Sequence, residues 1–143
     1  MKLSALALAL KRLNISRVAY AATEWNALNR KATSWFQQGK YTKAAMAATK
    51  AVQAAEEALG LNHPDVATRL NNLAYSYSEQ GKYAKAEPLF QRALAIQETA
   101  LGLNHPDVAT SLKNIAVLHR KTGRANSAER LADRAAKIRM ARR

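Results

Sequence analysis

A run of ten residues occurs twice in this chain, and the duplication restricts its fold more than any other feature does. The sequence Leu59–Thr68 returns unchanged as Leu101–Thr110, so the two copies are 42 positions apart. Glycines keep the same spacing at Gly39, Gly81 and Gly123. A constant period of this length is typical of repeat proteins, in which each repeat is one supersecondary unit. We therefore predict three related units.

Each unit is predicted to be a pair of amphipathic helices joined by a glycine turn. In the middle unit, apolar residues fall at the helical spacing i, i+3, i+4 and i+7, and a second apolar stripe follows Gly81. The two stripes are Leu70, Leu73, Ala74 and Tyr77, then Tyr83, Ala86, Phe90, Ala93 and Leu94. Glycine suits the left-handed residue that ends the first helix. Ala and Leu, which are strong helix formers, supply most of the 48% apolar content and also indicate an all-α chain.

The repeat also predicts where the helices begin and end. We expect first helices near 23–37, 64–79 and 106–121, and second helices near 40–58, 82–100 and 124–141. Pro64 and Pro106 suit a first helical turn, where a missing N–H costs nothing. Asn62 and Asn104 are predicted as N-caps, each followed by an aspartate in the first turn. One helix pair cannot bury its apolar stripe alone, so the pairs are expected to stack as an α-solenoid.

The middle unit resembles the tetratricopeptide repeat (TPR). The resemblance rests on Leu70-x2-Leu73-Ala74-x2-Tyr77, followed by Ala86-x3-Phe90 and Ala93. The period of 42, with the strings HPDVATxLNNLA, QGKY and AExLFxRALxIxE, is similar to the kinesin light chain subfamily. The similarity covers about residues 21–140 and implies a right-handed superhelix whose first helices line a concave groove for extended peptides. Kinesin light chains often bind acidic peptides, so the resemblance implies a protein or peptide partner that is acidic.

The resemblance also implies which residues face that groove. They are the second, fifth, sixth, ninth, twelfth and thirteenth residues of each first helix, counted from Trp25, Ala67 and Ala109. We call them the groove set: Asn26, Asn29, Arg30, Thr33, Phe36 and Gln37; Thr68, Asn71, Asn72, Tyr75, Ser78 and Glu79; Thr110, Lys113, Asn114, Val117, Arg120 and Lys121. Asparagine can donate to and accept from a peptide backbone, whereas Arg and Lys favour carboxylates. The alternative is that these are polar residues on a solvated helix face.

Units one and three depart from the pattern of the middle unit. Lys31 stands at the position of Leu73, Ala48 and Ala132 replace Phe90, and His119 replaces Tyr77. We therefore expect the outer units to pack less tightly. By the same alignment, units span about residues 21–60, 61–102 and 103–143.

Residues 1–20 are predicted to form a separate helical segment. Leu6, Ala9 and Leu10 align with Phe90, Ala93 and Leu94, so the segment is interpreted as the remnant of half a repeat. A targeting signal is the alternative, because a short apolar run precedes the small residues of Ala19-Tyr20-Ala21. No apolar run approaches the length of about 18 residues that a transmembrane helix requires. The absence of cysteine fits a reducing compartment, and we expect a cytoplasmic location.

The C-terminal helix is the rival binding site. The chain has 23 basic and 10 acidic residues, a net charge of +13, and the excess gathers after Lys113. A site for nucleic acid or another anionic surface is predicted at Arg130, Arg134, Lys137, Arg139, Arg142 and Arg143. The alternative is a polar cap, which the last repeat of a solenoid needs for solubility.

Nothing in the sequence indicates an enzyme, a cofactor or a metal site. The chain has no cysteine, no phosphate-binding glycine loop and no His-Glu-x-x-His motif. His63 and His105 are predicted to serve in turns and caps, and His119 to be a packed imidazole. We therefore expect an adaptor or scaffold that binds an extended acidic peptide, with self-association through the solenoid ends as a further expectation.

Overall fold

The computed structural model describes residue 5 and residues 17–142, with side chains from residue 23 onward. Within these residues it contains six helices and no strand: α2 (Arg17–Gln37), α3 (Tyr41–Leu59), α4 (Pro64–Glu79), α5 (Tyr83–Leu101), α6 (Pro106–Lys121) and α7 (Ala125–Met140). The last five lie within about two residues of the predicted ranges. Helix α2 starts earlier than predicted, so the expected boundary at residue 20 falls inside it. The proposed half-repeat of Leu6, Ala9 and Leu10 lies outside the described residues, as does Arg143.

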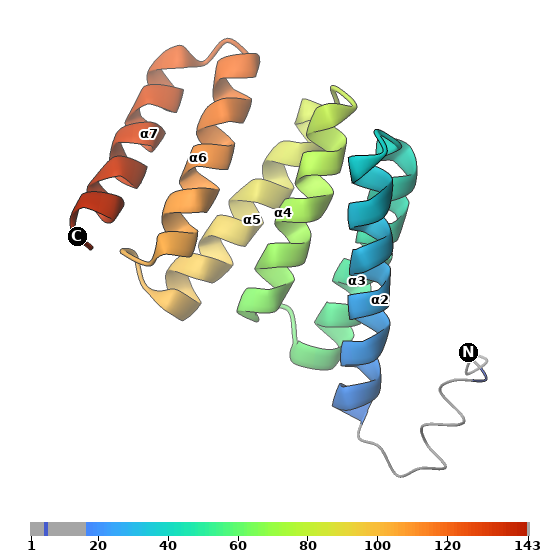
Figure 1. Ribbon diagram of the computed structural model, residues 1–143. Coiled ribbons are helices and arrows are strands. Elements are labelled where there is room, and N and C mark those ends of the chain that lie inside the picture. Colours follow the sequence, from blue (N-terminus) through green and yellow to red (C-terminus); the bar gives the residue numbers. More distant parts are fainter. Residues whose placement is uncertain (1–4, 6–16, 143) are drawn as a thin grey trace.

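Consecutive helices pack as antiparallel hairpins. The pairs are α2 with α3, α4 with α5 and α6 with α7, and the hairpins join through contacts of α3 with α4 and of α5 with α6. The three glycine turns lie along one edge of the stack, at the top of Figure 1, whereas the two loops that link the hairpins lie along the opposite edge. The predicted all-α stack of helix pairs is confirmed. Of the helices described, none is both long enough and apolar enough to cross a membrane.

The glycine turns end the first helices as the sequence predicts. Gly39, Gly81 and Gly123 have φ angles of 74°, 74° and 78°, in the left-handed region that favours glycine. The residue after each glycine donates its N–H back to the last turn, for example Lys40 to the carbonyl of Trp35 at 2.8 Å. These bonds satisfy carbonyls that the helix end leaves without partners.

The predicted N-caps of α4 and α6 are wrong by one residue. His63 and His105, not Asn62 and Asn104, occupy the cap position, and each imidazole Nδ1 accepts from the backbone N–H two residues later at 3.1 Å. The reason is that proline takes the first helical position, so the cap is the residue immediately before it. The prediction that both histidines serve as caps is confirmed.

The core consists of two apolar clusters, each centred on a junction between units. The first includes Trp25, Ala32 and a row of alanines on α3 that pack against Val66, Ala67 and Leu70. The second is built from larger side chains on α5, α6 and α7, among them Phe90, Leu112, Ile115 and Leu118. Lys31, which stands in the first unit where the second has Leu73, is exposed. This position therefore contributes nothing to the core of the first unit. Whether the outer units are looser than the middle one stays a prediction.

Candidate functional site

The groove set lies on α2, α4 and α6, and each of its side chains is exposed or half-buried. Part of the set lines two hollows between these helices. The other members are exposed around them, except Asn29 and Ser78, which are half-buried. The hydroxyl oxygen of Ser78 has no hydrogen-bond partner among the described residues. The hollows are therefore the part of the predicted groove with a defined shape.

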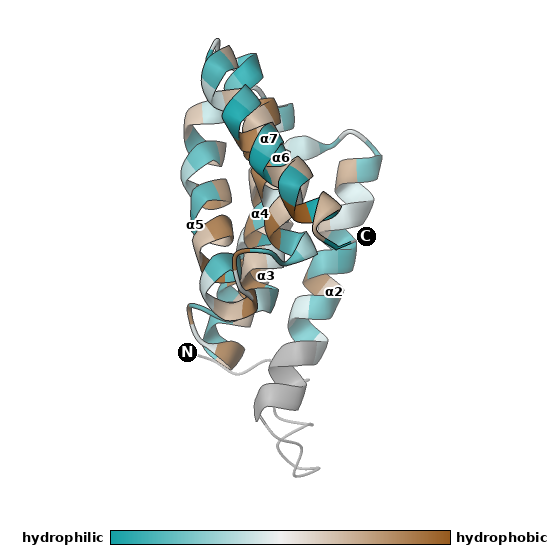
Figure 2. Ribbon diagram, turned by 90° about the vertical axis from the view of Figure 1, so that its left-hand side faces the viewer, coloured by the Kyte–Doolittle hydropathy of each residue, from teal (hydrophilic) through white to brown (hydrophobic). Residues whose placement is uncertain are grey.

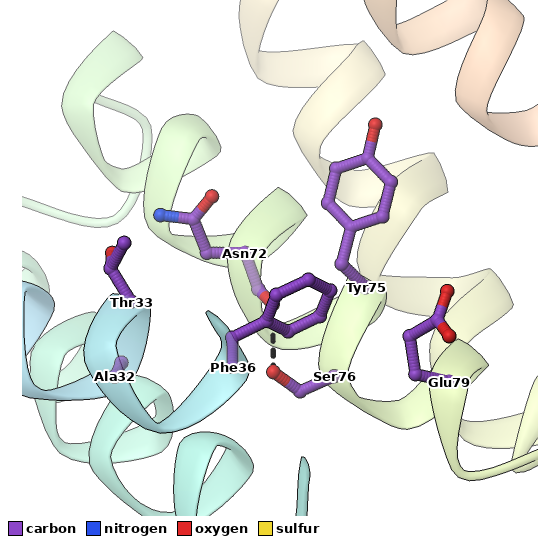
Figure 3. Close-up of a pocket in the computed structure, with 7 residues that line it drawn as sticks. All are labelled: Ala32, Thr33, Phe36, Asn72, Tyr75, Ser76 and Glu79. Atoms are coloured by element: carbon purple, nitrogen blue, oxygen red, sulfur yellow. Dashed lines mark hydrogen bonds between the residues drawn. The ribbon is translucent and has the colours of Figure 1, made fainter. Parts of the chain in front are cut away.

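The first hollow lies between α2 and α4 and has a volume of about 330 Å³. It is lined by Ala32, Thr33, Phe36, Asn72, Tyr75, Ser76 and Glu79. Figure 3 shows Phe36 reaching from α2 toward α4, with Tyr75 and Glu79 beyond it. Each of the two rings packs edge-on against a further aromatic ring. Phe36 packs against Tyr41 with 5.2 Å between the ring centres, and Tyr75 packs against Phe90 with 5.4 Å. The hollow thus has fixed aromatic walls and a polar rim.

The second hollow lies between α4 and α6 and has a volume of about 230 Å³. It is lined mainly by polar side chains: Thr68, Asn71, Asn72, Tyr75, Gln97, Asp107, Thr110 and Asn114. Asn72 and Tyr75 line both hollows, so the hollows adjoin one another across α4. Together they form a track that crosses the first helices from α2 to α6.

The asparagines of the groove set join neighbouring units. Asn72 donates to Asn29 on α2 at 3.0 Å, and Asn71 donates to Ser111 on α6 at 3.2 Å. The Tyr75 hydroxyl donates to Asn114 on α6. These bonds were not predicted, and they leave each amide only part of its hydrogen-bonding capacity for a ligand. The carbonyl oxygen of Asn71 has no partner among the described residues.

Burial raises the pKa of Tyr75, and the hydrogen bond to Asn114 lowers it by less. The phenol therefore keeps its proton at neutral pH and acts as a donor. Since its acceptor is on α6, the ring stays fixed between the two hollows.

Charge is unevenly distributed over the site. The two hollows contain the carboxylates Glu79 and Asp107 but no lysine or arginine. The cations of the groove set lie outside the hollows, at Arg30 on α2 and at Lys113, Arg120 and Lys121 on α6, and all four are exposed. Three of the four therefore stand on α6.

Comparison with known proteins decides the family. A family model described as "Tetratricopeptide repeat" matches residues 20–99 and 70–141. The chain belongs to the TPR family. No curated protein sequence matches it.

Several solved structures share the TPR fold of this chain. A putative kinesin light chain of Podosopora anserina with nearly identical TPR-like repeats has 23% identity and a TM-score of 0.73, over 80% of this chain and 55% of that one. BtubC (BKLC) from P. vanneervenii has 26% identity and a TM-score of 0.78, over 93% and 52%. The TPR domain of Arabidopsis FLU has 19% identity and a TM-score of 0.72, over 84% and 98%. This chain spans about half the length of the first two. The predicted likeness to kinesin light chain repeats is confirmed for the fold.

The basic C-terminal helix of this TPR domain is partly engaged in structural bonds. Arg134 pairs with Glu98 at 2.9 Å, and the Arg142 Nε donates to the carbonyl of Asn104 at 2.8 Å. Arg130, Lys137 and Arg139 are exposed, and Figure 2 shows that much of the α7 ribbon is coloured as hydrophilic. Anion binding at this helix stays a prediction, with three described cations left to carry it.

Sequence reasoning missed the polar cluster that joins the second and third units of the TPR domain. Arg124 donates two hydrogen bonds of 2.8 Å to Glu87, and His119, which is buried as predicted, bridges Glu87 at 3.0 Å and Ser127 at 2.8 Å. The bond from Arg124, and secondarily the one from His119, lower the pKa of Glu87. The sequence does not predict this contact, because nothing in a single repeat shows which unit Glu87 faces. Among the described residues, no group of three acidic or histidine side chains could hold a metal ion.

Proposed function

We propose that this TPR domain is an adaptor that holds an extended peptide across α2, α4 and α6. The TPR fold itself implies a protein-interaction scaffold, since repeats of this kind present extended binding surfaces. The observation that supports the specific proposal is the pair of adjoining hollows, because Asn72 and Tyr75 line both. An extended chain following them would meet an aromatic hollow first and a polar one second.

An apolar side chain of the peptide is assigned to the first hollow. Phe36, Tyr75 and Ala32 offer it aromatic and methyl surface, and the volume of about 330 Å³ suits a large side chain. Burying such a side chain contributes about 1.5–3 kcal/mol. This contact is expected to be the main source of affinity.

Carboxylates of the peptide are assigned to α6. Glu79 and Asp107 would repel acids placed inside the hollows, whereas Lys113, Arg120 and Lys121 attract them further along the track. Exposed ion pairs contribute at most about 1 kcal/mol each, so they favour acidic partners more than they add affinity. The ligand class is thus an extended peptide with an apolar anchor and acids to one side of it.

The adaptor is placed in the cytoplasm, which fits the lack of cysteine.

A library of peptides with separated apolar and acidic positions tests the proposal by selection and titration. Filling the first hollow with Thr33→Trp is expected to weaken the binding of the selected peptides at least about tenfold. Reversing the charge with Lys113→Glu and Lys121→Glu is expected to weaken the binding of acidic peptides and to leave the binding of neutral peptides unchanged. The matched controls are Thr99→Trp on the exposed side of α5, and Lys50→Glu with Lys137→Glu on α3 and α7.

The outcome that contradicts the proposal is equal weakening by the groove variants and their controls. Selection of peptides with neither an apolar anchor nor acids would contradict it too.

A further inference from the structure

The three glycine turns bring basic residues together on one edge of the stack. We define the turn edge as the residues of segments 35–43, 77–85 and 119–127, which lie at the top of Figure 1. Its cations are Lys40 and Lys43, Lys82 and Lys85, and Arg120, Lys121 and Arg124. Every unit therefore contributes cations to one line across the molecule.

The acids do not follow this arrangement. On the turn edge, Glu79 is the one carboxylate of the described residues, since Glu87 lies just beyond its limit and is paired with Arg124. The loops of the opposite edge and the helix ends beside them carry Glu56, Glu57, Asp65, Glu98 and Asp107. The turn edge is thus basic and the two loops that link the hairpins are acidic, whereas α7 also brings Arg139 and Arg142 to the opposite edge.

Six of the seven cations on the turn edge are exposed and form no ion pair with a described residue; Arg124 is the exception. Three lysines are instead positioned over aromatic rings. Lys40 and Lys43 lie 5.0 and 4.7 Å from the centre of the Trp35 ring, and Lys85 lies 5.6 Å from that of Tyr77. The rings hold these side chains at the edge without neutralising them, because an aromatic face carries no net charge.

The second helices also begin at this edge without an acidic cap. Lys40, Lys82 and Arg124 occupy the N-cap positions of α3, α5 and α7, none makes a side-chain cap, and none of the three first turns contains an acid. By contrast, α4 and α6 begin at the opposite edge with a histidine cap and an aspartate. First helices end at the turn edge as well, so the helix dipoles largely cancel there. What the N-termini add to the lysines is backbone N–H groups that can donate to an anion.

We propose that the turn edge binds the phosphate backbone of nucleic acid. A line of unpaired cations repeated from unit to unit fits a polymer whose charge also repeats at regular intervals. Base stacking plays no part, because none of the aromatic side chains of the turn edge is exposed and lysines lie over Trp35 and Tyr77. Binding is therefore independent of sequence and suits a duplex.

A lipid bilayer fits this edge less well. The large apolar side chains that are exposed in the described part of the chain are Met46, Leu61, Tyr75, Leu103, Val117 and Met140, and all lie outside the three segments. The turn edge therefore has no exposed large apolar side chain of described residues to insert below the headgroups, and charge alone anchors a protein weakly.

Binding of the full chain to two 20-base-pair duplexes of unrelated sequence, measured from 50 to 200 mM salt, tests the proposal. With about five phosphates contacted, the slope of log affinity against log salt is expected to be about −4 to −5 for both duplexes. Replacing Lys40, Lys43, Lys82 and Lys85 by Gln is expected to weaken binding at 50 mM salt at least about tenfold and to bring the slope closer to zero by about 3 to 4. None of the four belongs to the groove set, so this result is separate from the peptide-binding test.

The matched control removes the same charge elsewhere, by replacing Lys50, Arg130, Lys137 and Arg139 with Gln. It is expected to keep the affinity within about threefold, and thermal unfolding checks that both variants fold. Equal weakening by the two variants would show that net charge alone drives binding and would overturn the proposal. So would the absence of binding at 50 mM salt, or tighter binding to phosphatidylserine vesicles than to the duplex.

Discussion

The junction between the first and second units and the junction between the second and third are filled in different ways. At the first junction, small side chains on α3, mainly alanine, let α3 and α4 pack extensively. At the second, α5 and α6 approach one another closely along less of their length, around large side chains such as Phe90 and Leu112. Polar bonds differ as well, because Glu87 joins Arg124 and His119 at the second junction only, where the first has an alanine at the corresponding Ala45.

The difference shows that the repeat specifies the spacing of the helices more strongly than it specifies the side chains that fill the junctions. Both junctions also use one ion pair of the same kind, Arg92 with Glu56 and Arg134 with Glu98, in positions 42 residues apart. Apart from that shared ion pair, the first junction depends on the close approach of its helices, and the second depends on large side chains and further charged bonds. The stability of a solenoid is about the sum of its units and junctions, so the two can be tested one at a time.

The largest effect is expected from removing bulk at the second junction. Phe90 is 2% exposed and supports Tyr75 edge-on at 5.4 Å, so Phe90→Ala should lower the free energy of unfolding by about 3–5 kcal/mol. Urea unfolding measures the loss, and hydrogen exchange should show α6 and α7 opening before α2 and α3. A loss below about 1 kcal/mol would mean that this junction does not depend on its large side chains.

The reverse substitution tests the first junction. Ala48 is the counterpart of Phe90 and is 2% exposed, so Ala48→Phe must force a ring between closely packed helices. We expect it to destabilise the protein by about 1–3 kcal/mol, although it restores the residue found in the middle unit. The same urea experiment measures it, with Met46→Phe on the exposed side of α3 as the control. Stabilisation by Ala48→Phe would show that the first junction is underpacked, as its departure from the pattern led us to expect.

Much of the fold could be predicted because local chemistry determines it. Glycine at the left-handed position and proline in the first turn mark the helix ends from within one repeat. The same local chemistry favours His63 as the cap, because a residue before proline is held extended and directly precedes the helix. Residue preference alone favours Asn62.

The site was less predictable because its chemistry depends on contacts between units. The sequence identifies Asn71 and Asn72 as groove residues, but which neighbour each amide reaches depends on how the hairpins stack. The first hollow likewise combines Phe36 of one unit with Tyr75 of the next. The pattern shows such residues to be on the right face and does not show what they touch.

A smaller effect, which depends on pH, is expected at Glu87. Its pKa lies below the ordinary value of 4.5, so the stabilisation is complete above that value and is lost as the pH falls through the lowered pKa. Glu87→Gln should cost about 1 kcal/mol at pH 7, and the difference from the unmodified protein should shrink as the pH falls through the lowered pKa of Glu87. Unfolding curves measured between pH 7 and pH 3 would check both points. A difference that does not shrink between pH 7 and pH 3 would show that packing, rather than the carboxylate, accounts for the effect.

The smallest effect is expected at the neutral bonds of the first junction. Gln80 donates to the carbonyls of Tyr41 at 3.3 Å and Ser76 at 3.1 Å, so it ties α4 to the start of α3 without any charge. Gln80→Ala should lower the free energy of unfolding by about 0.5–1 kcal/mol, and by the same amount at pH 7 and pH 3. Measured in parallel with Glu87→Gln, it separates the two junctions by pH dependence instead of by size. If the cost of Gln80→Ala also disappeared in acid, the contrast between the neutral bonds of Gln80 and the charged bonds of Glu87 would be wrong.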